Sequence, residues 1–383
     1  MKNHKLLIFT LAFGTFSILN TEVGIVGILP VISKHFGIGI SGAGLLVSLF
    51  ALTISISGPI MPVVMGKFKI KRVLLFTLWI FVLSNIISAN TNNFTIALIA
   101  RIIPAIFHPV YCSYALTLAS NSVAPKEAPK AVSLVMMGVS SGMVVGTPVT
   151  TIIANHFSYA SAMYFLAIVS LLSVILNNLF LPKDSQITKI TSNEVALRQV
   201  IKRKNVWVSG LATISLAAAM SCVYSYVSDY LSQVARFEAN QLSSALFIFG
   251  LASICGNFIA GFGLSRSPQK FVAIAPIILA MIYILEPVLS QQYIWMFGLI
   301  IIWGAIYGIG NNTQQYLISS ALPNSLNLAN GLFISLGNVG ITIGTTIGGL
   351  ILGKWGIGIL PLAGIFLAIF TFFMIIWRNI ALV

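Results

Sequence analysis

The chain has 383 residues, of which 58% are hydrophobic and only 7% are charged. This balance excludes an ordinary soluble domain, in which about a quarter of the residues are charged. The net charge of +14 would suit a nucleic-acid partner, but the placement of the charges indicates a protein whose partner is the lipid bilayer, with no nucleic acid.

Apolar stretches recur along the whole chain, and a membrane span needs roughly 17 to 25 such residues. In chain order we predict helices over residues 6–32, 41–65, 73–89, 94–119, 131–153, 161–181, 205–231, 241–263, 271–290, 292–317, 329–352 and 359–381. The sequence therefore predicts an all-α membrane protein with about twelve transmembrane helices.

Basic residues mark one side of the membrane. Seventeen of the 21 lie at the two ends of the chain or in alternate loops. Lys34, Arg236 and Lys354 fall in the opposite loops, and Arg101 lies within a span. Because short cytoplasmic loops carry an excess of Lys and Arg, we predict a multi-pass protein of the plasma membrane with both termini cytoplasmic.

The chain divides into two similar halves. Residues 182–204 hold six basic residues and are predicted to form a cytoplasmic linker between six-helix bundles at 1–181 and 205–383. An offset of 198 matches Gly58 with Gly256, Arg72 with Lys270, Pro125 with Pro323, Ala131 with Ala329, Gly142 with Gly340 and Gly146 with Gly344. Parallel halves of this kind suit a rocking transporter with a site between them.

The first hairpin carries a distinctive order of residues, namely Thr21, Glu22, Gly27, Leu29, Pro30, Ser41, Gly42, Ala43, Gly44, Gly58 and Pro59. In this order the chain resembles the major facilitator superfamily, within it the drug and proton antiporter branch of bacterial sugar-efflux and purine-efflux permeases. The resemblance covers essentially the whole length. It implies two pseudo-symmetric six-helix bundles and transport by alternating access.

Two further segments are similar to motifs of that branch. Arg101 and His108 in the fourth span are similar to its Arg-centred motif, although Pro104 and Ala105 stand where a glycine usually follows. The fifth span resembles the antiport motif in its glycines and proline, at Gly138, Gly142, Gly146 and Pro148. The loop over residues 66–72 departs from the superfamily pattern because it has no acidic residue.

Ionisable residues inside lipid are costly and need an explanation. Glu22, Arg101 and His108 are predicted to line one polar track, because His108 follows Arg101 by seven residues on nearly the same helical face. In the functional interpretation Glu22 binds the coupling proton, Arg101 is its counter-charge and His108 is a relay. The alternatives are a structural Glu22 and Arg101 ion pair and an interior hydrogen-bonding histidine.

Neutral polar and aromatic groups are the candidate substrate contacts, because amides and phenols bind hydroxyls without demanding a charge. They are Tyr111 in the first half and Ser221, Tyr224, Ser225, Tyr307, Asn311, Asn312 and Gln315 in the second. Their alternative role is hydrogen bonding between helices. The offset places Met220, Leu299 and Ile306 opposite Glu22, Arg101 and His108, so the charges are confined to the first half.

The glycines of the fifth and eleventh spans, including Gly340 and Gly344, let helices approach closely. They form either plain packing faces or a seam between the halves, with Pro148 bending its helix. Asp229, Glu238 and Glu286 fall at external span ends and are predicted to be solvated.

The sequence favours a secondary transporter, with no enzyme activity, that exports a small organic solute such as a sugar, nucleoside or drug in exchange for protons. We expect no metal or other cofactor, because no Cys or His cluster has ligand spacing and no phosphate-binding glycine loop is present. The protein is expected to act as a monomer. The alternatives are a proton-coupled nutrient importer and a non-transporting membrane sensor on the same scaffold.

Overall fold

The computed structural model describes residues 2–38, 40–182 and 204–381. In these residues eleven helical segments are long and apolar enough to cross a membrane, and a shorter apolar helix, Gly42–Ser57, lies in the second predicted span. The prediction of an all-α membrane protein is confirmed. The predicted linker falls, apart from its two end residues, outside the described residues and stays a prediction.

The chain forms two compact units. The first comprises Met1–Asn193 and Ser325–Ser335, and the second comprises Glu194–Asn324 and Leu336–Val383. Helix α16 (Leu326–Trp355) therefore gives its first turns to the first unit and the remainder to the second.

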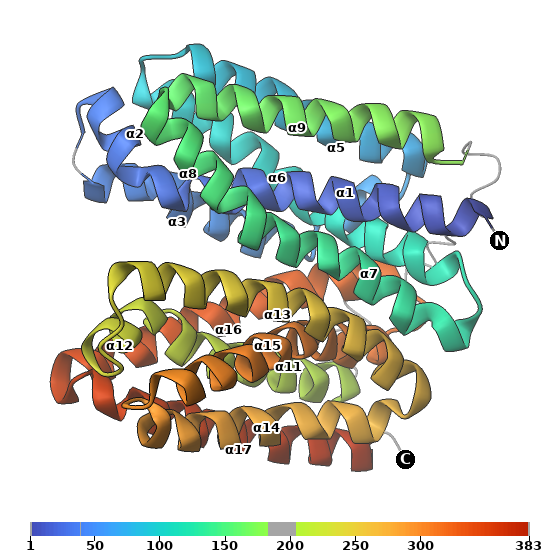
Figure 1. The fold of residues 1–383 in the computed structure, drawn as a ribbon. Coiled ribbons are helices and arrows are strands. Elements are labelled where there is room, and N and C mark those ends of the chain that lie inside the picture. The colour runs from blue at the N-terminus through green and yellow to red at the C-terminus, as the bar shows by residue number, and fades with distance from the viewer. Residues whose placement is uncertain (1, 39, 183–203, 382–383) are drawn as a thin grey trace. The chain divides into compact units, whose positions relative to one another are not determined.

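The first unit is built around α1 and α6. Its elements are α1 (Lys2–Gly24), η1 (Val26–Ile28), α2 (Leu29–Phe36), α3 (Ile40–Ser57), α4 (Met61–Met65), α5 (Ile70–Asn90), α6 (Phe94–Asn121), η2 (Pro125–Glu127), α7 (Ala128–Ser141), the π-helical η3 (Gly142–Gly146), α8 (Thr147–His156) and α9 (Tyr159–Phe180). Helix α1 packs against α7 and α9, and α6 packs against α3 and α5 (Figure 1). Phe50, Phe81 and Tyr111 are among the largest side chains of the buried core.

Two prolines lie inside α6 without ending it. Pro104 and Pro109 each lack the N–H that would bond to the carbonyl four residues earlier. The hydroxyl of Ser84 on α5 donates to the freed carbonyl of Ala100, and the hydroxyl of Ser57 on α3 lies 3.5 Å from that of Ala105. Neighbouring helices thus supply the donors that lipid cannot, which keeps α6 continuous past the candidate site.

The second unit contains α11 (Lys204–Tyr224), α12 (Val227–Gln233), α13 (Ala239–Arg266), α14 (Pro268–Leu289), α15 (Tyr293–Ala321), the main part of α16, η4 (Ile357–Ile359) and α17 (Leu360–Ala381). Helix α13 packs along α15, and α17 packs against α11 and α14 (Figure 1). The core of this unit includes Trp303, Tyr230 and Tyr283, which are almost fully buried.

Two of the predicted spans are broken at nearly equivalent points. Helix α1 ends at Gly24 and the chain resumes through η1 and α2, which has Pro30 in its first turn. Helix α11 ends at Tyr224 and the chain resumes at Val227. The break in α1 leaves carbonyls of its last turn without helical partners, and these carbonyls organise the candidate site.

The same offset of 198 relates the packing of the two units. A Cβ atom at Gly142 would lie 2.9 Å from Cβ of Leu19, and one at Gly340 would lie 2.5 Å from Cβ of Ala217. Two further contact pairs obey this offset, Gly146 with Asn20 and Gly344 with Ala218. The internal repeat is therefore present in the helix contacts as well as in the sequence.

Candidate functional site

Arg101 caps the broken end of α1. Its guanidinium donates from Nη1 to the carbonyl of Thr21 and from Nη2 to that of Glu22, both at 2.7 Å, and Nε donates to the carbonyl of Leu46 at 3.4 Å. Because α1 ends at Gly24, the carbonyls of Thr21 and Glu22 in its last turn have lost their helical partners. A cation also suits the negative end of a helix, so Arg101 fixes the backbone that carries Glu22.

The carboxylate of Glu22 contacts a histidine. Oε2 of Glu22 lies 2.9 Å from Nε2 of His108 on α6. The side chain of His108 is 6% exposed and that of Glu22 is 24% exposed, while the thiol of Cys112 lies 3.9 Å from the same Nε2. This is a largely enclosed carboxylate and imidazole pair with one edge open, an arrangement that can hold and pass on a proton.

Phe50 of α3 contacts both Arg101 and His108. The guanidinium carbon of Arg101 lies 4.3 Å from the centroid of the Phe50 ring. On the same ring the imidazole of His108 packs edge to face, with centroids 6.1 Å apart. A cation over an aromatic face is attracted to it, so Phe50 keeps Arg101 on the backbone carbonyls and leaves Glu22 to His108.

In the second unit a neutral side chain bonds to the equivalent carbonyls, which lie inside α11 before its last turn. The hydroxyl of Tyr283 on α14 donates to the carbonyl of Ala219 at 2.9 Å and lies 3.5 Å from that of Met220. By the offset of 198 these are the counterparts of Thr21 and Glu22. A neutral phenol therefore occupies the place that a guanidinium takes in the first unit.

An aromatic group lies near this second break. The ring of Tyr224 stacks on Phe249 at 4.7 Å and lies 4.8 Å from Tyr307, and Trp303 packs edge to face on Phe249 at 5.4 Å. Tyr224 and Tyr307 are half-buried. Asn311, one turn after Tyr307, is half-buried too and makes no hydrogen bond with the part of the chain that the structure describes. These groups form an amphipathic surface that can bind a neutral polar molecule.

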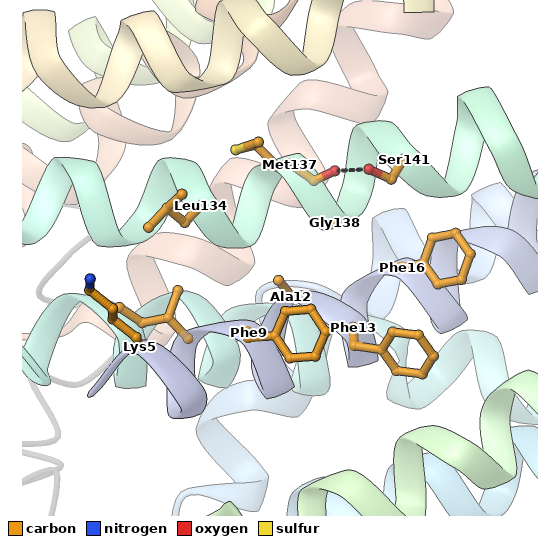
Figure 2. A pocket seen from close by; sticks show the side chains of 10 residues that line it. Lys5, Phe9, Ala12, Phe13, Phe16, Leu134, Met137, Gly138 and Ser141 are labelled. Carbon is orange, nitrogen blue, oxygen red and sulfur yellow. Dashed lines mark hydrogen bonds between the residues drawn. The ribbon is translucent and has the colours of Figure 1, made fainter. Parts of the chain in front are cut away.

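A separate apolar groove runs between α1 and α7 (Figure 2). Its volume is about 580 Å³, and Lys5 is the one charged residue that lines it. Its walls are Ile8, Phe9, Ala12, Phe13 and Phe16 of α1 and Leu134, Met137, Gly138 and Ser141 of α7. The groove shares no residue with the Glu22 and His108 pair.

Comparison with known proteins gives the family. The sequence profile of the Major Facilitator Superfamily matches residues 11–345. The chain belongs to the major facilitator superfamily. A protein of Helicobacter acinonychis (strain Sheeba) named "Probable sugar efflux transporter" is 27% identical over 375 residues, covering 97% of this chain and 94% of that protein.

Solved major facilitator structures have the same fold. The human organic anion transporter MFSD10 superimposes with a TM-score of 0.77 at 14% identity, covering 97% of this chain and 99% of that one. The fucose:proton symporter FucP of E. coli gives a TM-score of 0.75 at 17% identity, covering 97% and 98%. The predicted fold is therefore confirmed, and the chain is a membrane transporter of this superfamily.

The structure of this major facilitator chain brings the three predicted coupling residues together. The structure does not contain the ion pair of Glu22 and Arg101 that was the predicted alternative. The guanidinium of Arg101 bonds to the backbone of Glu22, and the carboxylate of Glu22 contacts His108. Sequence reasoning could not assign these partners, because the end of α1 that creates the backbone acceptors was predicted inside a continuous span.

Several of the predicted substrate contacts bond to neighbouring helices. The amide of Asn312 donates to Asn257 of α13 at 2.7 Å. The hydroxyl of Tyr111 is buried and donates to Asn177 of α9 at 2.9 Å. Gln315 is buried. These contacts are typical of hydrogen bonding between membrane helices.

Two candidate serines, Ser221 in α11 and Ser225 directly after it, also bond to a neighbouring helix. The hydroxyl of Ser221 donates to the carbonyl of Ala217 at 2.8 Å and lies 3.3 Å from that of Ile341, and Ser225 shares a hydrogen bond of 2.8 Å with Thr345. Among the predicted contacts, Tyr224, Tyr307 and Asn311 are half-buried and Ser225 is exposed, so these four retain open or partly open polar surface.

The glycines of the antiport-like motif pack on α1. The π-helical turn Gly142–Gly146 precedes Pro148, which stands in the first turn of α8. A proline cannot donate to the carbonyl four residues earlier, and a π-turn is a common adjustment inside membrane helices. The bend predicted at Pro148 thus coincides with an interruption of the helix.

One acidic residue was placed wrongly from the sequence. Glu286 was predicted to be solvated, but it is 0% exposed. Glu238 is exposed and caps α13 together with Gln241, and the side chain of Asp229 lies outside the described part. The expected exposure of Glu286 rested only on its distance from the end of a span. The sequence did not predict the separate helix α12 that follows the break in α11.

Proposed function

We propose that this transporter exports a small neutral organic solute, a sugar in the first instance, in exchange for protons, acting as a monomer in the plasma membrane. The observation that carries the proposal is the contact of 2.9 Å between the Glu22 carboxylate and the His108 imidazole. The name of the Helicobacter relative, which refers to sugar efflux, supports the direction and the substrate class.

A proton arriving at Glu22 neutralises the carboxylate and so weakens its attraction to His108. Arg101 keeps its bonds to the backbone of Thr21 and Glu22 in either case, because backbone carbonyls do not titrate. The main chain therefore stays fixed while the side chain changes partner. Such a local change in charge is what a proton-driven conformational cycle requires.

The half-buried groups of the second unit suit a solute without charge. Phenols and an amide bond to hydroxyls of a ligand, and aromatic faces cover the apolar side of a sugar ring. Helix α15, which carries Tyr307 and Asn311, has no charged residue between Tyr293 and Ala321. We therefore assign substrate binding to Tyr224, Tyr307 and Asn311.

The test is transport by purified full-length protein in proteoliposomes under an imposed pH gradient, with a panel of radiolabelled sugars. We expect wild-type protein to accumulate at least one sugar against its gradient on the side that supplies protons. Glu22→Gln mimics the permanently protonated side chain, so it should abolish this accumulation and retain counterflow exchange of the same sugar.

Glu127→Gln is the matched control, because Glu127 is an exposed carboxylate in η2 and should not affect driven transport. Wild-type accumulation by Glu22→Gln would show that Glu22 is structural. Accumulation on the side opposite to the proton supply would make the protein an importer that moves both together.

A further inference from the structure

Glu286 is a second buried carboxyl group, in the unit that lacks the Glu22 and His108 pair. It lies on α14, three residues before the helix ends at Leu289, and its residue is 0% exposed. Neither carboxyl oxygen has a hydrogen-bond partner among the described residues. An ionised carboxylate without water or partners is strongly disfavoured.

No described cation lies close enough to form an ion pair with Glu286. Helix α15 has no charged residue, α13 ends with Arg266, and α17 carries Arg378. Both arginines lie near the opposite end of α14. Arg266 lies two residues before Pro268, where α14 begins, and Asn379, the neighbour of Arg378, bonds to the carbonyl of Gln269. Seventeen residues of helix separate Gln269 from Glu286, about 25 Å.

The titratable groups that interact with Glu286 are two phenols, Tyr230 of α12 and Tyr283 of α14. The hydroxyl of Tyr230 is itself buried without a partner, and that of Tyr283 is committed to the carbonyl of Ala219. Arg236, in the connection after α12, is exposed to solvent, as is Glu238. Among the described residues, the surroundings of Glu286 therefore supply no counter-charge.

The backbone next to Glu286 has an acceptor to offer. Pro287 lacks the N–H that would bond to the carbonyl of Tyr283 in a regular helix. In α6 the carbonyl of Ala100, freed by Pro104 in the same way, accepts from a hydroxyl. A protonated carboxyl group also carries a hydroxyl donor, whereas a carboxylate carries none.

From these contacts we propose that Glu286 is a second proton-binding site, loaded as a neutral carboxylic acid in this conformation and emptied in another conformation of the transport cycle. The ligand is a proton and not a metal ion, because the described residues place no group of three His, Cys, Asp or Glu side chains together. Release in the cycle rests on the proposed function, whereas the bound proton does not.

The route for release is short. Glu286 lies about one helical turn from the end of α14. The turn after α14 is tied to the segment after α12 by Gln291, whose amide donates to the carbonyl of Val234 at 3.2 Å. Opening of this contact would admit water to a group that is now enclosed.

The test is infrared spectroscopy of reconstituted full-length protein at neutral pH, because the C=O stretch of a protonated carboxylic acid is absent from a carboxylate. We expect a band in wild-type protein that disappears completely in Glu286→Gln and persists in Glu22→Gln and Glu127→Gln. Glu286→Met serves as a second variant if the Gln protein does not fold. An identical spectrum in wild type and variant would overturn the proposal.

Release is tested in the same samples after transfer to D2O. We expect the band of Glu286 to shift as the bound proton is replaced by deuterium, and a band that never shifts would show a locked acid and refute the second step. Because neither measurement involves transport, they stand even if Glu22→Gln proves to be fully active in driven export. Failure of the proposed function is thereby distinguishable from failure of this inference.

Discussion

Cationic side chains in this transporter bond to the ends of helices. Arg101 binds the last carbonyls of α1, Lys71 donates to the carbonyl of Leu181 beyond α9 at 3.1 Å, and Arg378 lies 3.4 Å from the carbonyl of Leu317 in α15. Helix ends carry partial negative charge and unpaired acceptors, and lipid supplies no water to satisfy them. Lys71 thus has partners although its loop has no acidic residue.

The side-chain hydrogen bonds to the equivalent carbonyls of the two units should differ in strength. Arg101→Leu orphans two buried carbonyls, each at a cost of about 1–3 kcal/mol, whereas Tyr283→Phe removes one neutral hydrogen bond worth about 1 kcal/mol. We expect the melting temperature of purified protein in detergent to fall more for Arg101→Leu. Lys34→Leu, which removes an exposed charge, is the control. Equal melting temperatures for all three variants would contradict the capping role.

Scarcity of charge was sufficient to select Glu22, Arg101 and His108 from the sequence, because few ionisable residues fall within apolar spans. Their pairing was beyond the sequence, since it depends on the break at Gly24 and on the Phe50 ring. Glu286 was missed for a related reason. Its distance from a span end is readable in the sequence, but its covering by other elements is a tertiary property.

Pairs of helices in each unit approach closely through glycine. Gly142 contacts Leu19 and Phe16 of α1, and Gly340 contacts Ala217 and Ile214 of α11, at the same relative positions. Small residues let membrane helices pack backbone to backbone. Each contact lies inside one unit, so these glycines form packing faces, the plainer of the two predicted alternatives.

Replacing a glycine of these packing faces should lower the stability of the protein more where the neighbouring atoms lie closer. A Cβ at Gly340 would lie 2.5 Å from the carbonyl oxygen of Ile214, so Gly340→Ala must displace backbone and should destabilise by about 1–3 kcal/mol. Gly298→Ala is the matched control, because nothing lies within 4 Å of a Cβ there, and alanine favours a helix by up to about 1 kcal/mol. Thermal unfolding of both proteins measures the difference. A Gly340→Ala protein as stable as Gly298→Ala would refute the close packing of α16 on α11.

Long apolar segments made the helices predictable, and α6 begins at Phe94 as expected. The breaks at the ends of α1 and α11 were not predicted, although Gly24, Gly27 and Pro30 mark the first one. Glycine and proline are common inside membrane helices, so their presence alone does not identify the residue at which a span breaks. The residue at which a span breaks depends on which neighbouring side chains can donate to the freed backbone carbonyls.

The basic residues of the whole molecule are distributed unevenly along the chain. Basic residues gather at the termini, in alternate loops and in residues 182–204. Because the bias acts through short loops beside the spans, it should orient every span once the first ones insert. The orientation remains a prediction from the charges.

Cysteine labelling tests the orientation. In a background without native cysteines, Ser192→Cys should react with a membrane-impermeant maleimide only after the cells are opened. Gln291→Cys, in the exposed turn after α14, should react in intact cells and serves as the control. The reverse labelling pattern would place the termini and the linker outside and invert the proposed direction of transport.

The matching helix breaks have an evolutionary consequence. If the halves descend from one duplicated six-helix ancestor, both copies inherited a broken first helix with carbonyls that accept from a side chain of a neighbouring helix. One copy retained a guanidinium for them and the other adopted the phenol of Tyr283, which released the position equivalent to Arg101 to become Leu299. The fixed charge then persisted only beside the titratable pair of Glu22 and His108. Divergence after duplication would thus have separated two tasks that a symmetric ancestor performed in both halves.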